Sequence, residues 1–266
     1  MIGWIRRLFG QERPSPPPMS ASPLSASPLP ASPLPATPLP ASPLLDWEPT
    51  PQPPQVRSEA EIDAVEAALE GLIAAGLRLG PHYEGQSVRG VARSMAEHPE
   101  FALGDNNETL PLTERAPDAL AIDILWSYRA LADGIEDEFA NAAIFVDHCY
   151  DGADEEPYRA LFARVIEIAG VWTCRGLAVS RVPGLGPYGH GFRVAFETEP
   201  PIPAITFPAD KNFDWSLLEQ LDACRPAGET RRFRIAADGG AGLVLFLDDA
   251  AARAIALRLG WGPDDL

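Results

Sequence analysis

Apolar residues recur at helical spacing in the first part of the chain that is rich enough in them to form a core. The recurring positions are Ile62, Val65, Leu69, Leu72 and Ile73. Ser58 and Glu61 precede them in the pattern of a capping box, which predicts a helix over residues 58–75. The same spacing predicts shorter helices over 87–97 and 118–132.

After residue 139 the pattern changes to short apolar runs typical of strands, separated by helical segments and turns. A buried strand is predicted over 142–149, followed by a helix from about Pro157 to Ala169. The remaining predicted elements are strands over 171–182 and 191–199, a helix over 214–224, strands over 230–237 and 242–247 that meet at Asp238-Gly239, and a helix over 249–259.

Helices therefore come first and strands later, which predicts an α+β fold: a helical N-terminal part followed by a mixed, mainly antiparallel sheet with packed helices. The succession of strand, helix and strand within 142–182 fits one parallel crossover. Residues 104–116 contain the turn formers Gly, Asn, Asp and Pro and are predicted to be a loop. We expect one acidic globular domain over 56–266, with a subdivision near 136–140 as the alternative.

A proline-rich repeat separates this domain from the start of the chain. Residues 21–45 contain five variants of a five-residue unit, of which two read Ala-Ser-Pro-Leu-Pro. Because proline fixes φ and lacks an N–H donor, such a tract forms neither a helix nor a central strand. Residues 11–55 are therefore predicted to be a disordered, extended spacer.

The first ten residues have an amphipathic pattern with two arginines. On a helix, the apolar side chains share one face and the arginines take the other; the residues are Trp4, Ile5, Leu8 and Phe9 against Arg6 and Arg7. Ten residues are too few for a stable isolated helix, so residues 1–10 would become helical only on a surface. We predict a docking tip for a membrane interface or a partner groove. The alternative is a segment that folds back on its own domain or frays.

The charge of the chain is concentrated in the domain. The formal net charge is −17, and residues 1–55 are neutral because three arginines balance three acids. Such an acidic surface repels nucleic acid and favours a basic protein partner. Three widely spaced cysteines indicate no disulfide framework, and no apolar run reaches the length of a membrane span. We therefore expect a cytoplasmic protein that binds no nucleic acid, with the docking tip as a weak peripheral contact to the inner membrane.

Nine of the acids lie within the 24 residues from Asp133 to Glu156, a window that contains no lysine or arginine. Three interpretations remain open: a solvated acidic surface, a patch for a basic partner, and a cation site. The residues predicted to form the partner patch are Asp133, Glu136, Asp137, Glu138, Asp154, Glu155 and Glu156.

The same window holds the best candidate for chemistry. Asp147, His148 and Asp151 follow a predicted buried strand and offer carboxylate and imidazole ligands for a divalent metal. As a calcium loop the segment fails, because Tyr158 stands at the twelfth position, where a glutamate is required. No second histidine has ligand-like spacing, so a role as helix-cap and strand-end residues is the alternative. No other cofactor is expected.

Other motifs predict structure rather than chemistry. Residues 184–189 match the spacing G-x-G-x-x-G, but a strand follows them instead of a helix, which predicts a hairpin loop. His190 would point into a binding site if that loop covered a ligand. Cys174 lies within an apolar strand, where a thiol is typically inert. Arg232 and Arg234 alternate with apolar residues and are predicted to be surface charges available to the acidic window.

These observations favour a non-catalytic protein-interaction module, whose acidic domain binds a basic protein and whose tip docks elsewhere. The charge logic is that of an inhibitor- or immunity-type protein that neutralises a basic toxin. The alternative is a metal-assisted hydrolase with its site around Asp147, His148 and Asp151.

Overall fold

The structure is a computed structural model of the 266-residue chain. It describes residues 55–98, 101, 111–131, 134–146, 155–210, 213–237, 241–262 and 265–266. The docking tip, the spacer up to residue 54 and the Asp238-Gly239 turn therefore lie outside the described residues.

The described chain has the predicted α+β composition. Its helices are α2 (Glu59–Ala74), α3 (Val88–Ala96), α4 (Pro117–Leu125), α5 (Glu156–Ala169), α6 (Ser216–Asp222) and α7 (Asp249–Arg258), with short 3-10 turns at Pro81–Tyr83 and Leu112–Glu114. Its strands are β1 (Tyr128–Leu131), β2 (Gly134–Asp137), β3 (Ala142–Val146), β4 (Thr173–Pro183), β5 (His190–Glu199), β6 (Ile205–Pro208), β7 (Arg232–Ala237) and β8 (Ala241–Leu247). The described strand pairs are all antiparallel.

Two sequence-based expectations about these elements were wrong. The helix predicted over 118–132 ends at Leu125, and Tyr128 and Leu131 lie on β1, which forms a local hairpin with β2. The parallel crossover does not form, because β3 pairs with β8 whereas β4 pairs with β5 in a separate sheet. Strand β6 was not predicted; its four residues are at the lower limit of the usual pattern, and Pro203 shortly before it and Pro208 at its end argue against a strand.

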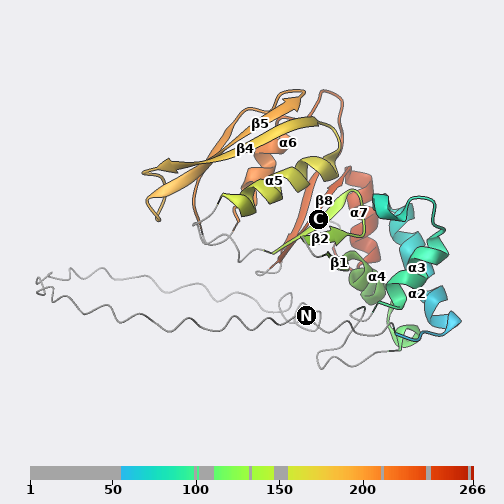
Figure 1. Cartoon of the computed structure of the whole chain (residues 1–266). Coiled ribbons are helices and arrows are strands. Elements are labelled where there is room, and N and C mark those ends of the chain that lie inside the picture. The colour runs from blue at the N-terminus through green and yellow to red at the C-terminus, as the bar shows by residue number, and fades with distance from the viewer. Residues whose placement is uncertain are drawn as a thin grey trace, which may run out of the picture.

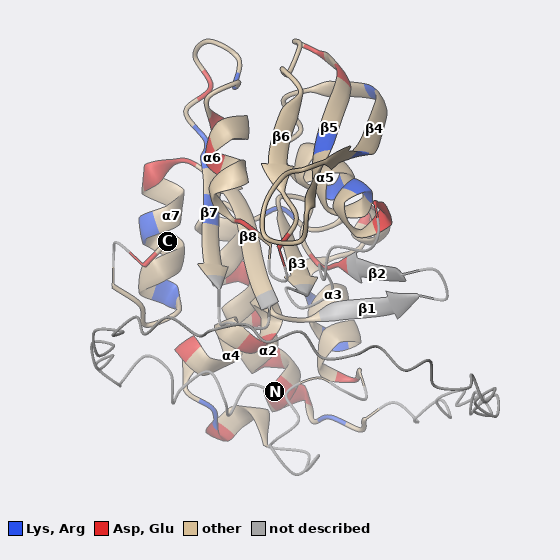
Figure 2. Ribbon diagram, turned by 90° about the vertical axis from the view of Figure 1, so that its left-hand side faces the viewer, with Lys and Arg blue, Asp and Glu red and all other residues tan. Residues whose placement is uncertain are grey.

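A central sheet with the strand order β3-β8-β7 separates two hydrophobic cores. Helices α2, α3, α4 and α7 lie on one side of it, whereas α5, α6 and the second sheet, β4-β5-β6, lie on the other (Figure 1). Figure 2 shows β8 in the middle of the central sheet, between β7 and β3. The molecule is thus layered, with helices, a sheet, helices again and a second sheet.

Strand β8 supplies side chains to both cores. Leu243, Leu245 and Leu247 belong to the core under the helical layer, and Val244 and Phe246 belong to the core that contains α5. All five side chains are buried. A strand covered on both faces has no polar alternation, which explains its continuous apolar sequence.

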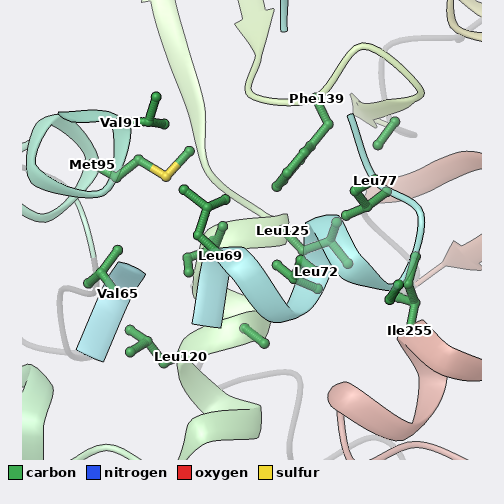
Figure 3. Close-up of a cluster of buried hydrophobic side chains, with 14 of the residues drawn as sticks. Val65, Leu69, Leu72, Leu77, Val91, Met95, Leu120, Leu125, Phe139 and Ile255 are labelled. Atoms are coloured by element: carbon green, nitrogen blue, oxygen red, sulfur yellow. The ribbon is translucent and has the colours of Figure 1, made fainter. Parts of the chain in front are cut away.

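The first core is built largely from α2 and its neighbours. Figure 3 shows Leu69 and Leu72 of α2 close to Leu125 of α4, with Phe139 above them and Ile255 of α7 at the side. Side chains one turn apart on α2 face the same way, so the helical period found in the sequence is the period of this contact surface.

The second core is rich in aromatic rings. Phe162 of α5 lies 6.1 Å, centroid to centroid, from Phe207 of β6 and also from Phe213. Gly242 leaves room for the indole of Trp215, since a Cβ at this glycine would lie 2.2 Å from the ring. The glycine at the start of β8 is therefore required by packing against the segment that leads into α6.

Glu61 connects the start of α2 to the 3-10 turn at Leu112–Glu114. Its carboxylate accepts hydrogen bonds from the Ser58 N–H (2.9 Å) and the Leu112 N–H (3.2 Å), and it pairs with Arg57 at 3.1 Å. Burial opposes ionisation of this group, but the hydrogen bonds from Ser58, Leu112 and Arg57 outweigh it and lower the pKa of Glu61 to about 2.

Replacing this carboxylate should make stability depend on pH in a defined window. A carboxyl whose pKa falls on folding stabilises the folded state above its ordinary pKa, and this contribution disappears as pH falls toward the folded-state value. The unfolding free energy of Glu61→Gln should therefore lie well below that of the unmodified chain at pH 7. The difference should shrink between pH 4.5 and pH 2. Urea unfolding measures it; a pH-independent difference, or an equal effect of the exposed Glu70→Gln on the same helix, would contradict this account.

Candidate functional site

Asp137 and Glu138, predicted to belong to an exposed acidic patch, are instead buried, with exposed fractions of 6% and 5%. The Asp137 carboxylate accepts a hydrogen bond from the Ile144 N–H at 2.9 Å and another from Arg164 Nε at 2.8 Å. Burial raises the pKa of the Asp137 carboxyl, while the hydrogen bond from Ile144 and the charge of Arg164 oppose the rise. Neither acid is available to a basic partner, because the fold encloses both side chains.

Glu138 is held by polar side chains of the helical layer. It accepts a hydrogen bond from the Tyr83 hydroxyl, and His82 Nε2 lies 3.5 Å from its carboxylate. The hollow that Asp137 and Glu138 line together with Ser127 has no room for a water-sized molecule. A buried acid in an open cleft would suggest catalysis, but among the described residues these two groups line no chamber for a substrate.

The Ile144 N–H, which donates to Asp137, lies on the outer edge of β3. At two other edge strands a carboxylate likewise accepts a hydrogen bond from a backbone N–H. At the β7 edge, Asp222 accepts from the Phe233 N–H at 3.1 and 3.2 Å. At the β4 edge, Glu155 accepts from the Arg181 N–H at 3.1 Å. Three edge strands are therefore capped by a carboxylate that takes the place of a neighbouring strand.

The rest of the predicted patch is divided between surface and undescribed positions. Glu156 is exposed and pairs with Arg159, and Glu155 is half-buried. The side chain of Glu136, on β2, is not described, and Asp133 and Asp154 lie outside the described residues. Acidic residues, red in Figure 2, also occur on α2, α4, α6 and α7, so the acidic character is not confined to the window.

The predicted metal ligands Asp147, His148 and Asp151 lie outside the described residues, so this prediction stays untested. Within the described ranges, no group of three or more His, Cys, Asp or Glu side chains is placed to hold a metal ion.

Residues 184–189 form the hairpin loop predicted between β4 and β5. His190 is buried; its Nδ1 lies 3.0 Å from Arg181 Nη2 and 3.1 Å from the Tyr188 carbonyl oxygen. Its ring therefore supports the hairpin from within. Cys174 is exposed, contrary to the prediction of a core thiol, because β4 is an edge strand with only one face covered.

The basic run on β7 lines an open groove of about 480 Å³ between this strand and α6. Arg232 and Arg234 were predicted to be surface charges available to the acidic window. Both pair with Asp249; the side chain of Arg232 is 47% exposed, whereas that of Arg234 is only 12% exposed. Arg225, also in the groove, donates to the carbonyl oxygens of Asp222, Glu229 and Arg231. Arg225 is thus held by carbonyl oxygens, while Arg232 and Arg234 share the single carboxylate of Asp249, and Arg234 Nε is buried without a hydrogen-bond acceptor among the described residues.

The remaining candidate surface is the outer edge of β4. This strand has 11 residues, the longest of the described strands, and lies at the end of the β4-β5-β6 sheet. A bulge interrupts its pairing between Cys174 and Gly176. Glu155 covers only the end of this edge, at Arg181.

Sequence reasoning missed the residues that define the strand edges. Asp222 is one charge among several near the end of a predicted helix. No local pattern distinguishes it, because its role depends on β7, which follows later in the chain.

Comparisons of the chain with models of protein families, with curated proteins and with solved structures found no match. No helix among the described residues is both long enough and apolar enough to cross a membrane.

Removing the β7 cap should destabilise the fold through one unsatisfied N–H. In Asp222→Ala the Phe233 N–H loses its acceptor, which should lower the unfolding free energy by about 1–3 kcal/mol. Asp222→Asn keeps an acceptor oxygen and should lose less. Burial raises the pKa of Asp222, so the charge itself is not favoured at this site. Urea unfolding measures both losses, with Glu219→Ala, an exposed position on the same helix, as the control. Equal losses for the Ala and Asn variants would show that the ion pair with Arg225 contributes more to stability than the hydrogen bond from the Phe233 N–H.

Proposed function

We propose that the chain is a non-catalytic protein-binding module for a basic partner. The observation that carries this proposal is that the buried and half-buried acids form contacts that stabilise the fold. Asp123 pairs with Arg115 at 2.7 Å, Asp137 and Asp222 cap strands, and Glu138 binds Tyr83. Because these carboxylates are used for contacts inside the fold, we attribute the attraction of a basic partner to the acidic side chains on the surface.

Ion pairing supports this interpretation. Many arginines of the described chain are matched one to one with acids, as Arg159 is with Glu156 and Arg175 is with Glu199. Pairing of this kind leaves the net charge of −17 unchanged. An excess of one sign steers oppositely charged proteins over a distance of about one Debye length, roughly 8 Å at physiological salt.

The contact surface we propose is the start of α5 together with the adjoining β4 edge, hereafter the α5–β4 surface. Glu155 and Glu156, both from the predicted partner patch, occupy this place. They are the members of that patch whose side chains are described and lie at least partly on the surface. The α5–β4 surface therefore combines carboxylates with an accessible strand.

The N-terminal segment supplies a second contact in this proposal. Its support is the sequence pattern alone, since residues 1–54 lie outside the described residues. A spacer of about 45 residues, at roughly 3.1 Å each in an extended form, would let the domain reach about 140 Å from the docking tip. The tip would bind a membrane interface or a partner groove, while the domain binds the basic protein.

Capture from a lysate of the native host tests the function. The full-length chain should retain a basic protein in a stoichiometric amount and release it in a salt step. Glu155→Gln with Glu156→Gln removes two charges but keeps the hydrogen-bond acceptor for Arg181. This double variant should bind the captured protein about threefold more weakly, since exposed charge pairs contribute little each.

A charge-matched variant is the control for this experiment. Glu70→Gln with Glu84→Gln also removes two exposed carboxylates, but from the helical layer and the turn beside it. It should leave the affinity nearly unchanged. Equal weakening by both double variants would mean that only total charge matters, and the absence of a basic partner would overturn the proposal.

A further inference from the structure

The edges of the two sheets are not protected to the same degree. On the five-residue β3, Asp137 caps the N–H of the middle residue, Ile144; on the six-residue β7, Asp222 caps the N–H of the second residue, Phe233. Strand β6 has only four residues and ends in Pro208, which has no N–H to offer. Strand β4, by contrast, is long and is capped only near one end, by Glu155.

The backbone groups of β4 that face outward can be assigned from the pairing. The Arg181 N–H points away from β5, because Glu155 receives it. In an antiparallel strand, alternate residues point to the same edge, so the N–H and C=O groups of Val179 and Leu177 also face outward. Among the described residues, no side chain accepts a hydrogen bond from the Val179 or Leu177 N–H. The centre of this edge is therefore able to pair with another strand.

One acidic side chain reaches toward this open edge. Glu197 of β5 lies directly opposite Gly176 of β4, on the exposed face of the sheet. A Cβ at Gly176 would lie only 2.8 Å from Glu197 Oε2, so the carboxylate extends over the glycine. Glu199, the neighbour on the same face, is paired with Arg175 at 2.9 Å, whereas Glu197 has no ion-pair partner among the described residues.

We infer that the β4 edge is a strand-addition site, which takes an extended segment of a partner with a lysine or arginine opposite Gly176. This inference rests on the proposed function and specifies how the partner binds. The added strand would receive main-chain hydrogen bonds from Leu177 and Val179, and its basic side chain would pair with Glu197. Because Gly176 has no side chain, the Glu197 carboxylate on β5 can extend over β4 and pair with a basic side chain on the added strand.

Charge argues for a basic segment as the occupant. At the Gly176 end of the edge Glu197 and Glu199 outnumber Arg175, whereas Glu155 and Arg181 balance each other at the opposite end; the chain as a whole carries a net charge of −17. Ala178 on β4 and Ala195 on β5 are small side chains on the exposed face and leave space for bulky residues of the added strand, while Arg193 lies on the same face opposite Ser180. Main-chain bonds provide affinity in this mode, and the alternate side chains provide specificity.

A peptide probe with a blocked backbone tests this mode of binding. The probe is a ten-residue peptide of alternating lysine and valine. Its matched control has the same sequence but is N-methylated at two adjacent central residues, which blocks hydrogen bonding on both edges without a change in charge. Affinity for the full-length chain is measured by titration calorimetry. The unmodified peptide should bind on the order of tenfold more tightly, because two or three backbone hydrogen bonds are at stake.

Variants and hydrogen exchange locate the site. Glu197→Gln should weaken binding of the unmodified peptide by about threefold, while Glu70→Gln on α2 should not change it. The amides of Leu177 and Val179 should become protected from hydrogen exchange when the peptide binds.

The outcomes separate this inference from the proposed function. Equal affinity for the two peptides, or protection at amides outside β4, would overturn strand addition and leave a purely electrostatic surface for the basic partner. No binding of the unmodified peptide would also overturn strand addition, whereas the proposed function is overturned only if no basic partner is captured. Preference for the unmodified peptide, with protection at Leu177 and Val179, would support both.

Discussion

The structure depends on how the open edges of two small sheets are satisfied. Each sheet has only three strands in the described chain, so most of its strands are edges with unpaired backbone groups. On three of these edge strands a backbone N–H donates a hydrogen bond to a carboxylate, that of Asp137, Asp222 or Glu155. A carboxylate can accept such a bond without offering a donor of its own, so no further strand pairs with that N–H group. On β4 the carboxylate satisfies only Arg181 and leaves the centre of the edge open.

This constraint gives part of the acidic composition a structural origin. Asp137 and Asp222 are taken from water, which raises the pKa of each and makes the ionised form costly. Arg164 beside Asp137 and Arg225 beside Asp222 reduce that cost. The acidic window is therefore not one uniform surface, since Asp137 and Glu138 are buried whereas Glu156 is exposed.

The sequence predicted those elements that are determined by interactions between neighbouring residues. The capping box and apolar period of α2 and the hairpin of β4 and β5 follow from neighbouring residues, and these elements were predicted. The strand partner of β3 was not, because β8 lies about 100 residues away and apolar strands pair equally well with several neighbours. The burial of Asp137 could not be predicted either, since it depends on Arg164 and on the strand edge that the carboxylate covers.

The position of β8 in the chain has a consequence for synthesis. Helices α2, α3 and α4 are made first, but their core is completed by Leu243, Leu245 and Ile255 from β8 and α7. When synthesis has reached residue 240, β3 and β7 have been made, but the strand that joins them and covers the helical layer, β8, has not. Folding of both cores therefore waits for the same late segment, and the nascent chain needs protection from aggregation until that segment emerges.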